Sequence, residues 1–137
     1  GRRGLRDQGI QRLRYTGKPL SMVTDCQVEA DGLRIDFNFP LDPKRASDLK
    51  SYFGEQWNYH WRPEYGSDMF SPATDRPGKD KLNIKSALLS AHGKSVKLMV
   101  PDLKPVNQIH LKLNLKAESG EPFAEEVYWT INRVPKP

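Results

Sequence analysis

Apolar and polar residues alternate along several short stretches of the chain, with the period of half-buried β-strands. The pattern predicts strands at 23–30, 33–39, 57–61, 82–89, 96–100, 109–115 and 127–131. Turn signals at Asp31-Gly32 and at 91–94 predict two hairpins, and residues 117–122 are expected to turn the chain between the last two strands. About seven short strands at this spacing are typical of an antiparallel β-sandwich.

One short helix interrupts the strands, at Pro43–Leu49. The Asp42 side chain can accept a free backbone N–H of the first turn, and proline at the first helical position loses no hydrogen bond. Leu41, Ala46 and Leu49 are expected to face the sheets. Residues 66–80 combine glycine, serine, proline and charged residues, which predicts a long loop with a role in binding or docking.

The net charge of +5 belongs to the N-terminal end. Residues 1–18 hold 6 basic side chains against Asp7 alone, and the other 119 residues hold 16 basic and 16 acidic ones. A nucleic-acid-binding domain carries basic residues on its folded surface, beside stacking aromatic rings. We therefore expect a basic arm at 1–20, a neutral domain at 21–137 and no nucleic-acid partner.

The sequence lacks the residues or motifs that several kinds of structure and catalysis require. Cys26 is the only cysteine, which excludes a disulfide framework and a thiolate metal site. No apolar run is long enough to span a membrane. No serine-protease elbow, phosphate loop or dinucleotide fingerprint occurs, so we expect no catalytic site and no cofactor.

Metal binding has weak support. His60, His92 and His110 lie in different predicted elements without ligand spacing. Asp68, Asp75 and Asp80 fall in or beside the 66–80 loop but lack the alternating pattern of a dedicated calcium loop. We expect no metal site, and calcium in this loop stays an open question.

Aromatic residues cluster at 57–65, in a chain otherwise poor in them. The candidate ligand-binding residues are Trp57, Asn58, Tyr59, His60, Trp61 and Tyr65. If 57–61 is a strand, its three rings share one face, while Asn58 and His60 share the other.

Three interpretations of this cluster remain open. The rings can fill the space between two sheets, as a tryptophan on a central strand often does. They can form an exposed row that stacks on sugar rings, with Asn58, His60 or Glu55 bonding hydroxyl groups. They can also dock a neighbouring domain, because large exposed apolar patches usually contact a partner. The first interpretation predicts buried rings, and the second predicts at least two coplanar exposed ones.

Three motifs resemble bacterial Ig-like modules: GLRIDFNFPLDP at 32–43, SALLSAHGKSV at 86–96 and VPDLKP at 100–105. His92 stands where the second motif usually has aspartate. Together with 56–59 and 65–67, the longer match resembles a module of large exported bacterial proteins. These proteins join a sugar-dehydrogenase-like β-propeller, an Ig-like module and a c-type haem domain, and residues 13–19 resemble the closing segment of that propeller.

This resemblance implies an all-β, Ig-like antiparallel β-sandwich with one short helix and a long aromatic-flanked loop. It implies an extracytoplasmic location, periplasmic or secreted, and a non-catalytic accessory role: organising neighbouring domains of the parent protein or binding a partner. No Cys-x-x-Cys-His motif is present for covalent haem. The alternative function is a carbohydrate-binding module that holds a polysaccharide on the aromatic cluster at Trp57–Tyr65.

Overall fold

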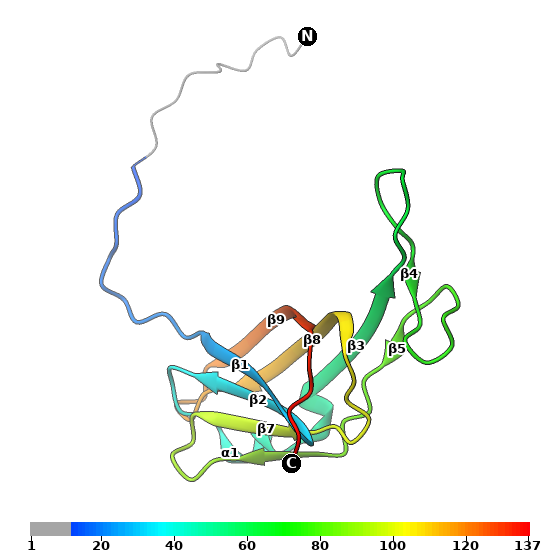
Figure 1. Ribbon diagram of the computed structural model, residues 1–137. Coiled ribbons are helices and arrows are strands. Elements are labelled where there is room, and N and C mark those ends of the chain that lie inside the picture. The colour runs from blue at the N-terminus through cyan, green and yellow to red at the C-terminus, as the bar shows by residue number, and fades with distance from the viewer. Residues whose placement is uncertain (1–11) are drawn as a thin grey trace.

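The computed structural model describes residues 12–137, which fold into two antiparallel β-sheets packed face to face (Figure 1). In chain order the elements are β1 (Val23–Glu29), β2 (Gly32–Phe37), α1 (Pro43–Ala46), η1 (Leu49–Ser51), β3 (Tyr52–Tyr59), β4 (Met69–Phe70), β5 (Asp80–Lys81), β6 (Ser86–Leu89), β7 (Ser95–Met99), β8 (Val106–Lys116) and β9 (Pro122–Ile131). Across 12–137, no helix is long and apolar enough to cross a membrane.

The strand order is that of an immunoglobulin-type sandwich. One sheet runs β1-β2-β7-β6, and the other runs β4-β3-β8-β9 with β5 also paired to β3. These orders correspond to strands A-B-E-D and C′-C-F-G of immunoglobulin domains. The predicted fold class is therefore confirmed by the arrangement of the strands.

The core lies between the two sheets and is made by alternate residues of their central strands. Leu33, Ile35, Val96, Leu98, Ile109 and Leu111 have no exposed surface. Burying an aliphatic side chain of this size contributes about 1.5–3 kcal/mol each. Phe37, Phe39 and Phe123 continue the core toward one end, with ring centroids 4.9–5.8 Å apart.

The predicted helix is shorter than expected. The Asp42 carboxylate accepts the backbone N–H of Arg45 at 2.9 Å, as predicted for the cap of α1. Leu41 and Ala46 are buried, but Leu49 is 42% exposed. The prediction for Leu49 is wrong because α1 ends at Ala46 and η1 starts a new turn, so the helical spacing does not extend to position 49.

The arm that precedes the sandwich is described from residue 12; residues 1–11 lie outside the described part. Residues 12–22 are extended and mostly exposed. Asn38 holds the end of this segment, because its Nδ2 donates to the Leu20 carbonyl (2.7 Å) and its Oδ1 accepts the Met22 N–H (2.9 Å). The chain joins the sheet at Val23.

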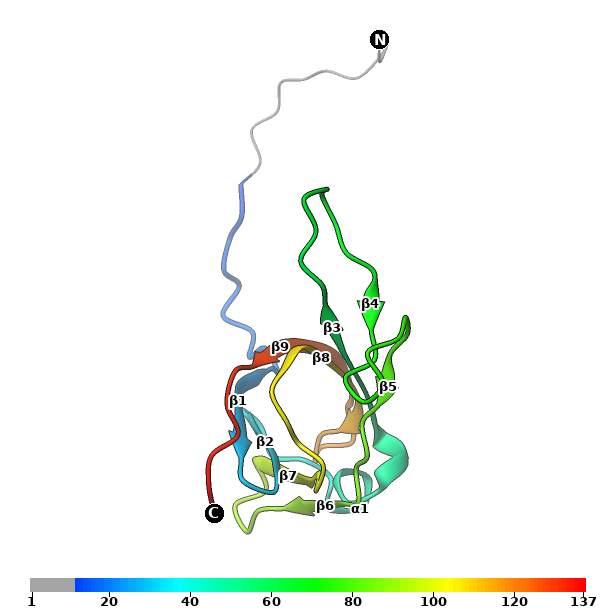
Figure 2. The same ribbon diagram turned by 45° about the vertical axis from the view of Figure 1, so that its right-hand side comes forward.

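The segment from β3 to β4 is a hairpin that projects beyond the sandwich, from the same end as residues 12–22 (Figures 1 and 2). We call residues 60–68 its tip. The predicted 66–80 loop is therefore not one irregular segment. It contains the return strand β4, a compact turn at 71–79, and β5, which pairs with β3 again.

The β1–β2 hairpin is confirmed, but its turn is Ala30-Asp31 rather than Asp31-Gly32. Gly32 pairs with Glu29 inside the ladder and with Met99 of β7. A Cβ atom on Gly32 would overlap the backbone carbonyl oxygen of Leu98. Glycine is thus required here by the close approach of β7 and not by the turn.

This requirement is testable by substitution. We expect Gly32→Ala to lower the free energy of unfolding by about 1–3 kcal/mol, because the added carbon meets backbone that must shift. Gly32→Asn is the control, since asparagine suits a left-handed turn but is no smaller than alanine. Urea denaturation should find both variants destabilised, and a well-tolerated Gly32→Asn would contradict the close-approach explanation.

Candidate functional site

The six residues predicted to bind a ligand do not form one surface. Trp57 is buried, Asn58 and His60 are partly buried and hydrogen-bonded within the protein, and Tyr59, Trp61 and Tyr65 are exposed. The strand that carries them begins at Tyr52 and ends at Tyr59, so Trp61 lies beyond it, in the tip. The cluster therefore separates into parts with different structural roles.

Trp57 is buried on the outer face of its sheet, outside the core between the sheets. On β3, Tyr52 and Gly54 point inward against the core, so the alternation places Trp57 outward. The Lys79 ammonium lies 4.8 Å from the Trp57 ring centroid and 3.4 Å from Glu55 Oε2. Trp57 thus neither fills the inter-sheet space nor offers an open ring face.

Asn58 and Asn107 exchange hydrogen bonds where β3 leaves the sheet. Asn58 Oδ1 accepts the Asn107 backbone N–H at 2.9 Å, and Asn107 Oδ1 accepts the Tyr59 N–H at 2.8 Å. Thr130 Oγ1 donates to the Asn107 carbonyl at 2.7 Å. Because backbone N–H groups can only donate, these bonds fix which end of each amide is oxygen.

His60 joins the base of the hairpin to the following turn. Its ring stacks on Phe70 with centroids 3.7 Å apart, and its Nε2 lies 2.6 Å from Asp75 Oδ1. Its backbone N–H donates to Ser67 Oγ at 3.0 Å. His60 therefore contacts both the return strand and the 71–79 turn, and one face of its ring is covered by Phe70 while the side chain remains partly exposed.

The tip carries the most exposed large rings of the folded part. Trp61 is 88% exposed and Tyr65 is fully exposed. Arg62 and Asp68 form an ion pair across the tip at 3.6 Å, and Gly66 has φ +93°, the left-handed conformation that a tight turn needs. Among the stacked and edge-on ring pairs found in 12–137, none joins Tyr59, Trp61 and Tyr65.

A shallow groove of about 380 Å³ lies at the base of the hairpin. It is lined by Asn58, Tyr59, His60, Asp75, Pro105, Val106, Asn107, Thr130, Ile131 and Asn132. The sequence pattern pointed to the first three of these residues. It gave no sign of Asn107, Thr130 and Asn132, because they come from β8, β9 and the chain after β9.

The three aspartates considered for calcium each contact a different part of the protein. Asp80 accepts hydrogen bonds from Ser71 Oγ (2.7 Å) and the Ala73 N–H (3.0 Å), which orders the 71–79 turn. Asp75 contacts His60, and Asp68 contacts Arg62. Over the described range, no three histidine, cysteine or acidic residues come together as a metal site.

The outer face of the second sheet holds a polar cluster around His110 that the sequence did not suggest. His110 is 7% exposed, and its ring stacks on Tyr128 with centroids 4.2 Å apart. Glu126 Oε2 lies 3.4 Å from Nε2, and Glu55 Oε2 lies 3.9 Å from Nδ1. Partial desolvation raises the pKa of Glu126, but the electrostatic interactions with Lys112 and His110 and the hydrogen bonds from Tyr128 and Lys112 together lower it.

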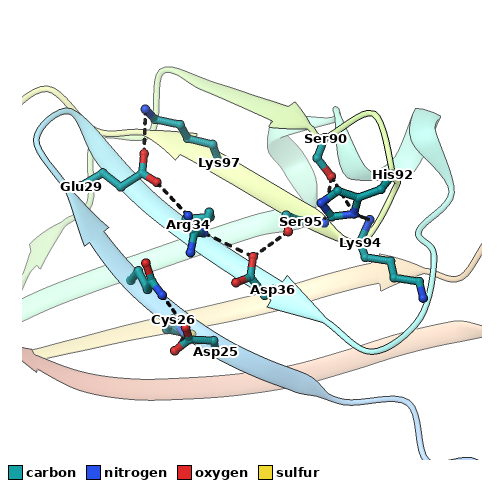
Figure 3. A network of polar contacts seen from close by, with 11 residues as sticks. Asp25, Cys26, Glu29, Arg34, Asp36, Ser90, His92, Lys94, Ser95 and Lys97 are labelled. Atoms are coloured by element: carbon teal, nitrogen blue, oxygen red, sulfur yellow. Dashed lines mark hydrogen bonds and ion pairs between the residues drawn. The ribbon is translucent and has the colours of Figure 1, made fainter.

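The outer face of the first sheet carries a second network of charges (Figure 3). Arg34 lies between Glu29 (3.6 Å) and Asp36 (3.4 Å), and Lys97 Nζ contacts Glu29 (2.8 Å) and Asp31 (2.7 Å). The hydrogen bond between Lys97 and Asp31 lowers the pKa of the aspartate and raises that of the lysine. These cations face carboxylates, so this face offers no basic patch for phosphate.

His92 lies in the β6–β7 turn and accepts the backbone hydrogen bond that an aspartate would accept at this position. Its Nδ1 accepts the backbone N–H of Lys94 at 3.1 Å and lies 3.3 Å from Ser90 Oγ (Figure 3). An aspartate carboxylate makes the same bond two residues onward in many turns. The departure from the Ig-like motif at this position therefore preserves the hairpin.

Cys26 is a poor nucleophile. Burial, followed by the negative charges of Asp25, Glu125 and Asp36, raises the pKa of its thiol from 9.0 to about 11. The reactive thiolate is consequently scarce at neutral pH.

No protein-family model matches the chain, and no curated protein matches it. Among solved structures, the chain is similar to CopC from Methylosinus trichosporium OB3b, with a TM-score of 0.44 and 12% sequence identity over 81% of this chain and 92% of that chain. A similarity at this level assigns neither a family nor a function. The resemblance to bacterial Ig-like modules therefore stays a prediction at the level of the family.

Trp57 and Trp61 are four residues apart, but the first is buried on the outer sheet face and the second is exposed in the tip, so their substitution tests these positions. We expect Trp57→Ala to lower the free energy of unfolding by about 3–5 kcal/mol, as for a buried aromatic residue. Trp61→Ala should change it by no more than about 0.5 kcal/mol, because the ring is exposed. Thermal and urea unfolding of both variants measure the difference, and equal losses would contradict the assigned positions.

Proposed function

We propose that this chain is a non-catalytic accessory module that binds a protein partner through the tip of the β3–β4 hairpin. One observation carries the proposal: Trp61 and Tyr65 are almost wholly exposed on an element that projects from the sandwich. Soluble domains seldom leave neighbouring large rings uncovered without a binding role. Tryptophan and tyrosine are also the side chains that most often dominate protein interfaces.

The base of the hairpin is ordered in a way that favours binding. The Asn58–Asn107 exchange fixes one side, and the stacking of His60 on Phe70 fixes the other. Because these contacts fix the base from which the tip projects, less conformational entropy is lost on association than for a loop without such anchors. A narrow convex tip suits insertion into a pocket of a protein better than contact with a flat polymer.

The non-catalytic part of the proposal rests on the positions of the reactive groups. Within 12–137, His60 lies in the hairpin, His92 in the β6–β7 turn and His110 on β8, and Cys26 lies on β1, so these groups do not come together. The groove at the hairpin base contains only one imidazole–carboxylate pair, His60 with Asp75. In the Ig-like modules that the sequence resembles, the partner would be a neighbouring domain of an exported protein.

Site-specific photocrosslinking in the source cell tests the proposal. A benzophenone amino acid at position 61 or 65 should give a defined crosslink to one protein, and mass spectrometry shows whether this protein is the same polypeptide or a separate one. Position 53 is the matched control, because Phe53 is exposed on the outer sheet face, away from the tip.

The purified partner then permits a quantitative test. We expect the double variant Trp61→Ala/Tyr65→Ala to bind it about 100-fold more weakly or worse, as for two interface hot spots, with an unchanged melting temperature. The proposal fails if positions 61 and 65 crosslink no better than position 53. It also fails if the double variant binds the crosslinked partner as tightly as the parent chain.

The carbohydrate alternative is favoured by one observation at a different place. Tyr59 is 43% exposed and borders the groove at the hairpin base, where amide and hydroxyl groups gather. Trp57 cannot contribute a platform ring, because its side chain is buried. In the carbohydrate alternative, the proposed binding site is therefore the groove at the hairpin base and not a row of aromatic rings.

A further inference from the structure

We infer that the groove at the base of the β3–β4 hairpin is a binding site for a neutral saccharide, with Tyr59 as its stacking ring. The inference deepens the carbohydrate alternative and rests on the accessory binding role, but not on docking through the tip. It adds Asn107, Thr130 and Asn132 as binding residues, which come from elements remote from Tyr59 in sequence.

The groove offers oriented hydrogen-bond donors. The oxygens of Asn58 and Asn107 are occupied by backbone N–H groups, which leaves both NH₂ groups as the free ends of these amides. In the hydrogen bonds found among 12–137, neither Nδ2 has an acceptor, and both residues line the groove. Two immobilised amide donors suit the ring and hydroxyl oxygens of a sugar.

The groove also offers acceptors, which sugar hydroxyl groups need as donors. Asp75 uses Oδ1 for His60, so its second carboxylate oxygen remains for a ligand. Thr130 Oγ1 donates to the Asn107 carbonyl and retains its lone pairs. Asn132 lines the groove as well, and none of the hydrogen bonds of 12–137 uses its side chain.

The charge of the lining selects against anions. None of the residues that line the groove is a lysine or arginine, and Asp75 adds a carboxylate. A phosphate or a uronic acid would meet this negative charge without a compensating cation. The groove also lacks the ligands that a metal ion needs. Its single carboxylate already contacts His60, and no cluster of three histidine, cysteine or acidic residues forms in the described residues 12–137.

Tyr59 supplies the apolar contact that a sugar face requires. Its backbone N–H is bound to Asn107 Oδ1, so the base of the side chain is held at the rim of the groove. A phenol ring that is nearly half exposed can pack against polarised C–H groups and bond with its hydroxyl. One ring beside convergent polar groups is the usual composition of a small-ligand site.

The test is a calorimetric titration of the intact chain with neutral hexasaccharides of glucose, xylose, mannose and N-acetylglucosamine, and with a galacturonic acid hexamer. We expect at least one neutral hexasaccharide to saturate the protein, and Tyr59→Ala to weaken its affinity about tenfold or more. Asn132→Ala should weaken it as well. Tyr128→Ala is the matched control, because Tyr128 is similarly exposed on the outer sheet face.

The outcomes separate this inference from docking through the tip. Loss of affinity in Tyr59→Ala, with sugar binding intact in Trp61→Ala/Tyr65→Ala, supports the groove. The inference is overturned if no neutral hexasaccharide saturates, or if the galacturonic acid hexamer binds best. It is also overturned if Tyr59→Ala with a normal melting temperature binds like the parent chain, or if only the tip variant loses binding.

Discussion

The exchange of hydrogen bonds between Asn58 and Asn107 is the constraint on which the hairpin end of this protein depends. Regular pairing of β3 with β8 stops at Trp57 and Gln108. Beyond that point β3 would separate from the sheet with unpaired backbone groups, but the two amides satisfy the N–H groups of Tyr59 and Asn107. The strand can therefore leave β8 without losing these hydrogen bonds, while its opposite edge pairs with β4 in the projecting hairpin, and the groove lies at the base of that hairpin.

Ion pairs occur on the outer faces of both sheets as well as in the hairpin. On the first sheet, Arg34 and Lys97 face carboxylates, and on the second sheet Lys112 and the buried His110 both lie beside the Glu126 carboxylate. Such cross-strand pairs contribute little stability individually at an exposed surface. Their effect is to pair the cations of these two networks with carboxylates, whereas the hairpin end presents large exposed rings.

The sequence predicts the sandwich well because its central strands alternate strictly. Leu33 and Ile35 on β2, and Ile109 and Leu111 on β8, are buried as the alternation requires. The pattern fails on β3, where the inward position 56 is a glutamine and the outward position 57 is a tryptophan. Position 57 is covered by Lys79 from a later turn, and no local pattern contains that contact. The groove was only half predictable for the same reason: Asn107 and Asn132 reach it through tertiary structure.

The continuity of β3 from the hairpin into the middle of the second sheet has a mechanical consequence. A partner that pulls on the tip along the strand loads the β3–β8 ladder in shear, so the hydrogen bonds from Tyr52 to Trp57 resist together rather than opening one after another. The core residues beneath β8 oppose the same sliding, because a shift of one residue would turn their side chains to the wrong face. Tension applied at the tip would thus be carried along β3 into the centre of the second sheet.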